Sequence, residues 1–154
     1  MIEYHNILLA SHGTPGARAA ENMALALAAP GARLLQLVVV PDFWKGMMGD
    51  DWLNNARTRD VYGRHIETQL GREIDEELAR LRAQAQAAGL RHESRVVLGK
   101  PAECLLEWAA QERLDLVVMG SPRPPGVRGL RSRMHPETLV RGLRAPLLVA
   151  PYPA

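Results

Sequence analysis

The sequence predicts an α/β protein built on a doubly wound parallel sheet with helices on both faces. Five short apolar runs are separated by segments with helical signals, at residues 7–10, 34–40, 93–98, 116–119 and 146–150. Runs of this kind fit strands that are buried on both faces of a sheet. Parallel neighbours require crossover connections. The alternation therefore indicates a single domain over residues 1–154.

The first helix is predicted directly after the first strand. Thr14 is a good N-cap residue, and Pro15 suits the first helical turn. An alanine-rich stretch, Ala17–Ala29, continues the helix and allows it to lie close to a sheet. Pro30 and Gly31 are expected to end it before the second strand begins.

Residues 41–59 form a hydrophobic connection after the second strand. It contains Trp44, Met47, Met48 and Trp52, and its glycines argue against one regular helix. Long connections are often lids or binding loops, and methionine-rich surfaces adapt to protein partners. Packing against the next helix is the simpler interpretation. A protein-interaction module that uses this segment is therefore an alternative hypothesis.

The longest predicted helix covers residues 60–88. Its apolar residues recur at steps of three and four, as Ile66, Leu70, Ile74, Leu78, Leu81 and Ala85. Glu76 and Arg80 are expected to form an i,i+4 pair on the solvent side. Gly89 is the expected C-terminal cap.

Two shorter helices are predicted in the second half of the chain. Pro101 and Glu103 open the first of these, which ends near Glu112. Its inward residues are expected to be Leu105, Leu106, Trp108 and Ala109. The second short helix opens at Pro136 and Glu137 and carries Leu139, Val140 and Leu143.

A basic loop joins the fourth strand to the last helix. It contains Arg123, Arg128, Arg131 and Arg133, and no carboxylate occurs from residue 116 through residue 136. A strand, a loop and a helix N-terminus form the layout that α/β proteins use to hold an anion at the carboxyl edge of a sheet. The sequence therefore predicts an anion-binding loop here, and a merely solvated cationic loop is the alternative.

Composition restricts the partners and the compartment. The net charge is only +2, and the basic loop has no aromatic residue for base stacking, so nucleic acid is not an expected partner. The apolar runs are too short to span a membrane. The single cysteine, Cys104, favours a reducing compartment, and the sequence shows no signal peptide. A cytoplasmic protein is expected.

Neither a catalytic site nor a metal site is predicted. The five histidines and Cys104 show no metal-ligand spacing. Ser121 and His12 both follow strands, but Asp115 precedes its strand and is expected at the opposite end of the sheet. A Ser-His-Asp arrangement is therefore not expected, and the protein is predicted not to be an enzyme.

Four segments together resemble the universal stress protein family over essentially the whole chain. They are Ile7-Leu-Leu-Ala followed by Gly13-Thr14, then Gly99-Lys-Pro-Ala-Glu103, Leu114-Asp-Leu-Val-Val-Met-Gly-Ser121 and Ala145-Pro-Leu-Leu-Val149. The resemblance implies a five-stranded sheet in the order 3-2-1-4-5. It also implies a homodimer that pairs through the last strand, at Leu147, Leu148, Val149 and Ala150.

Many members of this family bind ATP through a pattern of Gly, two residues, Gly, nine residues, Gly, and then Ser or Thr. On this sequence the first glycine is Gly120, whereas the next three positions fall on Arg123, Arg133 and Met134. An aspartate that is usual after the first strand falls on His12. The candidate residues for a nucleotide or another anion are Ser11, His12, Gly13, Val38, Gly120, Ser121, Arg123, Arg133 and Met134.

Two hypotheses follow from these departures. The protein has lost ordinary ATP binding and kept a basic, anion-accepting loop, or arginines have replaced backbone amides as the grip on phosphate. We favour the first, because Met134 has no hydroxyl and Pro122, Pro124 and Pro125 have no amide hydrogen. The physiological ligand is not given by the sequence, and ATP is retained as the ligand of the second hypothesis.

Overall fold

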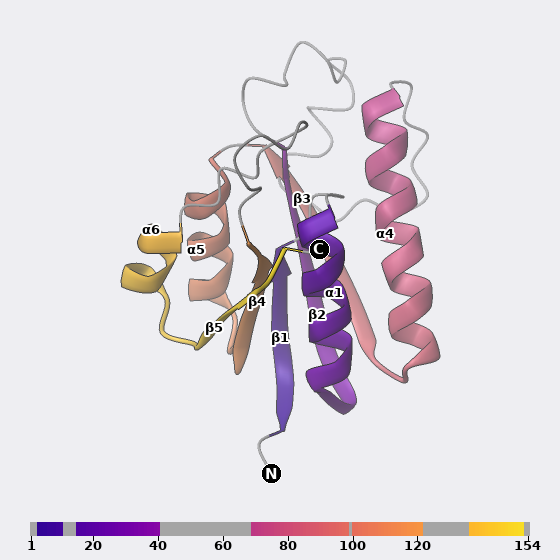
Figure 1. Ribbon diagram of the computed structural model, residues 1–154, viewed down its shortest axis with the longest axis horizontal. Helices are drawn as coiled ribbons and strands as arrows, with labels where there is room; N and C mark the ends of the chain where they lie inside the picture. The colour runs from indigo at the N-terminus through magenta and orange to yellow at the C-terminus, as the bar shows by residue number, and fades with distance from the viewer. Residues whose placement is uncertain (1–2, 11–14, 41–68, 99, 122–135, 153–154) are drawn as a thin grey trace.

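The computed structural model describes residues 3–10, 15–40, 69–98, 100–121 and 136–152, and the strands and helices of these ranges alternate along the chain (Figure 1). In chain order the elements are β1 (Tyr4–Ala10), α1 (Pro15–Leu27), β2 (Ala28–Val40), α4 (Gln69–Ala87), β3 (Arg91–Leu98), α5 (Pro101–Gln111), β4 (Leu116–Gly120), α6 (Pro136–Gly142) and β5 (Leu147–Ala150).

The five strands form one sheet in the order β3-β2-β1-β4-β5, and every neighbouring pair is parallel. This confirms the predicted fold class and strand order. In Figure 1, α1 and α4 lie on one side of the sheet, and α5 and α6 lie on the other. The chain reverses its direction of winding between β1 and β4, which are adjacent in the sheet.

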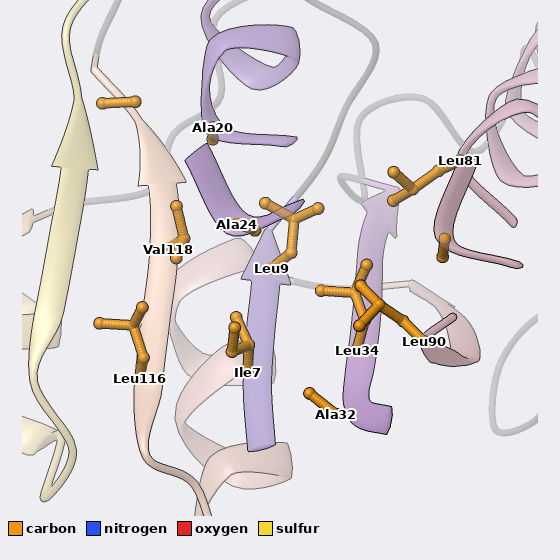
Figure 2. Packing of buried hydrophobic residues seen from close by; sticks show 12 residues of the cluster. Ile7, Leu9, Ala20, Ala24, Ala32, Leu34, Leu81, Leu90, Leu116 and Val118 are labelled. Carbon is orange, nitrogen blue, oxygen red and sulfur yellow. The ribbon is translucent and has the colours of Figure 1, made fainter. Parts of the chain in front are cut away.

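Successive residues of the central strands face opposite sides of the sheet, so each strand contributes to two cores. Ile7 and Leu9 pack toward α1 and α4 with Ala20, Ala24 and Leu81 (Figure 2). All five of these side chains are fully buried. The two alanines leave α1 little side-chain bulk on its inner face, which fits the close approach that the alanine-rich sequence predicts.

The second core lies under α5 and α6. Leu8 of β1 packs there with Leu105, Trp108 and Leu139, which come from the two helices. The Cζ atom of Arg95 lies 4.6 Å from the centroid of the Trp108 ring, so a cation also covers the aromatic face. Of the four predicted inward residues of α5, Leu105 and Trp108 are buried, whereas Leu106 and Ala109 are half-buried.

The start of β2 differs from the prediction. Helix α1 ends at Leu27 and the strand begins at once, so Pro30 and Gly31 lie inside β2 rather than at a helix cap. Tyr4 pairs with Ala28, and the register then shifts so that Asn6 pairs with Arg33. Gly31 has φ +76, a left-handed conformation that lets the strand absorb its extra residues.

The predicted pair between Glu76 and Arg80 is wrong. Arg80 Nη2 donates to Glu77 Oε2 at 2.6 Å and to the carboxylate of Glu21 on α1. Glu21 is only 1% exposed, and a buried carboxylate requires a cationic partner. Arg80 is therefore directed across the helix pair toward α1. The end of α4 is as predicted, because Gly89 has φ +77 and Leu90 N donates to Ala85 O.

A buried histidine should make stability depend on pH. His92 Nε2 lies 2.9 Å from Oε1 of the fully buried Gln36. Burial, together with the positive charge of Arg82, lowers the pKa of His92 from 6.5 to about 4. The negative charge of Glu93 opposes this shift. The unfolded chain therefore binds this proton more readily, and the free energy of unfolding should fall as pH drops from 6.5 toward 4.

The matched variant is His92→Gln, measured by urea denaturation across this pH range. Burial raises the pKa of Asp75 to about 6, which stabilises the fold as pH falls and opposes the histidine in the same window. Both proteins contain Asp75, so its contribution cancels when the free energy of unfolding of His92→Gln is subtracted from that of the wild type at each pH. Equal pH slopes for the two proteins would contradict the assignment to His92.

Candidate functional site

The predicted ligand edge is formed by the carboxyl ends of β1, β2 and β4. Ala10 is the last residue of β1 and pairs with Leu37 of β2. Val38, the next residue of β2, therefore lies just beyond the carboxyl end of β1. Gly120 ends β4 and pairs with Ala150 of β5. Val38 and Gly120, which were predicted for the same site, therefore lie at one edge of the sheet on either side of β1.

Gly120 and Ser121 occupy the point at which the order of the strands reverses. Ligands of open α/β sheets bind in the crevice outside the carboxyl ends of the strands at such a point. Gly120 is buried, and Ser121 N donates to Ala150 O at 2.9 Å. Ser121 Oγ is also buried and has no hydrogen-bond partner within the described part of the chain. A buried hydroxyl of this kind is available to a bound group.

Several predicted residues lie outside the described ranges. They are Ser11, His12, Gly13, Arg123, Arg133, Met134 and the whole of residues 41–59. The sequence places the first three directly after β1, and the next three in the segment between Ser121 and α6. The anion-binding loop and the Trp/Met-rich segment thus remain predictions from sequence.

Asp115 lies at the amino edge of the sheet, as predicted. Its Oδ2 accepts hydrogen bonds from the backbone N–H groups of His5 at 2.7 Å and Asn6 at 3.0 Å. Its own N–H donates to Asn6 O at 2.8 Å. The carboxylate therefore fixes the start of β4 against β1, at the end of the sheet away from Ser121.

The last strand, β5, forms one edge of the sheet. It pairs with β4 on one side only among the described strands. Within the predicted dimer surface, Leu147 and Leu148 are half-buried against the two cores, and Ala150 is fully buried. Val149 is 39% exposed. Of the four side chains, Val149 is therefore the one that the fold leaves most available to a partner.

Within the described ranges, no group of three or more His, Cys, Asp or Glu side chains is arranged to hold a metal ion. Within the same ranges, no helix combines the length and the apolar character that crossing a bilayer requires.

Comparisons with known proteins agree with this fold. Residues 3–151 match the family model described as the universal stress protein family. A Thermus aquaticus protein named "universal stress protein in QAH/OAS sulfhydrylase 3'region" is 31% identical over 152 residues, which are 95% of this chain and 98% of that protein.

Solved structures are similar over nearly the whole chain. The hypothetical protein MJ0577 superposes with a TM-score of 0.73 at 19% identity, covering 97% of each chain. A universal stress protein in complex with cAMP has a TM-score of 0.60 at 20% identity, covering 99% of this chain and 100% of its own. At these identities the structures bear on the fold alone.

Proposed function

This chain belongs to the universal stress protein family, and from that premise we propose that it is a dimeric, non-catalytic stress-response regulator whose basic loop accepts anions without ordinary ATP binding. The observation that carries the proposal is the composition of the loop after Gly120. Arg123, Arg133 and Met134 occupy the positions that the ATP-binding pattern assigns to two glycines and a hydroxyl residue.

The chemistry of these replacements supports the loss of ordinary ATP binding. Glycine lets backbone amides close on phosphates, and an arginine side chain at the same position obstructs that approach. Pro122, Pro124 and Pro125 have no N–H to donate, and Met134 has no hydroxyl. Guanidinium groups still match phosphate or carboxylate oxygens in pairs. The loop therefore favours a general anion over a nucleotide.

A second candidate function is a nucleotide-dependent switch in which arginines hold the phosphates. The observation that favours it is the buried Oγ of Ser121, beside Gly120 at the strand-reversal point, which has no hydrogen-bond partner among the residues that the structure describes. A universal stress protein of similar fold is known in complex with cAMP. Under this hypothesis Val38 lies near the base, and the guanidinium groups of the loop arginines bind the phosphates in place of backbone amides.

The compartment and the lack of catalysis belong to the same proposal. Cys104 is the single cysteine of the sequence, which fits a reducing compartment such as the cytoplasm. Asp115 is held by backbone N–H groups at the amino edge, away from Ser121. We therefore expect no turnover of ATP to ADP.

The loop arginines can be tested with tripolyphosphate as the probe anion. Calorimetry at low salt should detect its binding to the wild-type chain, and Arg123→Ala or Arg133→Ala should weaken it by about tenfold or more, because each removes a charge-assisted contact of roughly 1.5–3 kcal/mol. Added salt should weaken binding of the wild type.

The matched control is Arg141→Ala, which removes an exposed arginine of α6 outside the loop. Its affinity for tripolyphosphate should equal that of the wild type. If the loop variants and the control bind alike, the anion is not held by the loop, and this assignment fails.

A further inference from the structure

A pocket lies at the amino edge of the sheet, far from the carboxyl edge that holds Gly120 and Ser121. Its volume is about 450 Å³, and it is formed by the C-terminal half of α5, the segment that leads into β4, and residues 142–145 after α6. Figure 1 shows α5 and α6 side by side on one face of the sheet. A volume of several hundred Å³ is typical of small-molecule sites.

The pocket wall is set by close packing of the two helices. A Cβ atom added to Gly142 would lie only 2.8 Å from Leu106 Cδ2. Glycine at this position therefore lets the end of α6 approach α5 directly. Leu106, Leu114 and Leu143 line the pocket and belong to the second core or pack against it. These half-buried side chains supply the apolar part of the pocket wall.

Two opposite charges also line the pocket. Glu112 is held in place by Arg33, whose Nη1 donates to Glu112 Oε2 at 2.9 Å and whose Nε binds Glu93. Since one arginine is shared by two carboxylates, this group retains net negative charge. Carbonyl groups at the end of α5 add partial negative charge on the same side.

Arg144 is the positive group of the pocket. It is exposed and forms no ion pair or hydrogen bond with any residue in the described ranges. In particular, it is not paired with Glu112, although both line the same cavity. The pocket thus presents a separated cation and anion next to an apolar wall.

We propose that this pocket binds a free α-amino acid with an apolar side chain. The carboxylate of the ligand binds Arg144, and its ammonium group faces Glu112 and the carbonyl end of α5. Leu106, Leu114 and Leu143 enclose the apolar side chain. A zwitterion matches both charges at once. A simple acid would be repelled by Glu112, and a simple amine would be repelled by Arg144. The site is independent of the basic loop.

The test is a titration of the full chain with L-leucine, followed by amide chemical shifts. Leucine should shift amides in residues 106–114 and 142–145. Leucinamide lacks the carboxylate, and 4-methylpentanoate lacks the ammonium group. Each should bind about tenfold more weakly or worse, since each loses a charge-assisted contact.

Variants locate the site. Arg144→Gln should weaken leucine binding by about tenfold, whereas Arg141→Gln, also an exposed arginine near the end of α6 but outside the pocket, should leave it unchanged. Ala110 is exposed and lines the cavity, so Ala110→Leu should fill the pocket without disturbing the core and abolish binding.

The proposal is overturned if leucine shifts no amides in the two segments, or if Arg144→Gln binds leucine as tightly as Arg141→Gln. It is also overturned if leucinamide binds the wild-type chain as tightly as leucine does. This last comparison uses only the unaltered protein and therefore does not depend on the folding of any variant.

Discussion

A Val149→Glu substitution is expected to convert a dimer of this chain into a monomer. Val149 lies on the edge strand β5 and is 39% exposed, although it is a large apolar residue. In a two-fold symmetric pairing of edge strands, the same residues of both copies meet near the axis. Two glutamates brought together there should cost about several kcal/mol of association free energy. Light scattering after size exclusion measures the change directly.

Val140 provides the matched control. It is 67% exposed on α6 and is the other large apolar side chain that is exposed within the described ranges. Val140→Glu should leave the dimer intact. Leu148→Glu is a less clear test, because Leu148 packs against the first core and its loss would also unfold the chain. A monomeric wild type, or a dimer that survives Val149→Glu, would contradict pairing through β5.

Replacing Leu81 with Ala is expected to reduce the free energy of unfolding by about 3 kcal/mol. Leu81 is a fully buried residue of α4 in the first core, and Figure 2 shows its side chain directed from α4 toward β2. The substitution removes buried methyl groups and leaves a cavity that the tightly packed core cannot close.

Urea denaturation measures this loss, with the m-value as a check on two-state unfolding. Gln86→Ala on the exposed face of α4 is the control and should change stability by less than about 0.5 kcal/mol. If Leu81→Ala costs no more than the control, α4 does not cover the sheet as described.

The sheet could be predicted because its central strands are buried on both faces. Such strands appear in the sequence as continuous apolar runs, and their parallel connections leave few topologies. Predictions from neighbouring residues in the sequence were wrong where contacts with distant residues determined the structure. The turn signal of Pro30 and Gly31 was overridden by pairing of Ala28 with Tyr4. Arg80 pairs with Glu77 and with Glu21 on another helix rather than with Glu76, because the buried carboxylate of Glu21 requires a cation.

The candidate site was predictable to the extent that it follows strand direction. A residue that ends a parallel strand lies at the carboxyl edge, which placed Gly120 at one end of the sheet and Asp115 at the other. The amino-edge pocket could not be predicted in this way. Its two segments, 106–114 and 142–145, meet only because α5 and α6 pack together. Gly142 was the one local signal of that close approach.

The most direct test of the proposed function is a calorimetric comparison of ATP with tripolyphosphate, both with Mg²⁺, on nucleotide-free protein at physiological salt. A loop that accepts anions through arginine side chains should bind ATP no more tightly than tripolyphosphate. Micromolar binding of ATP that is about tenfold or more tighter than that of tripolyphosphate would show recognition of the nucleoside. That result would contradict the loss of ordinary ATP binding and establish the nucleotide-dependent switch.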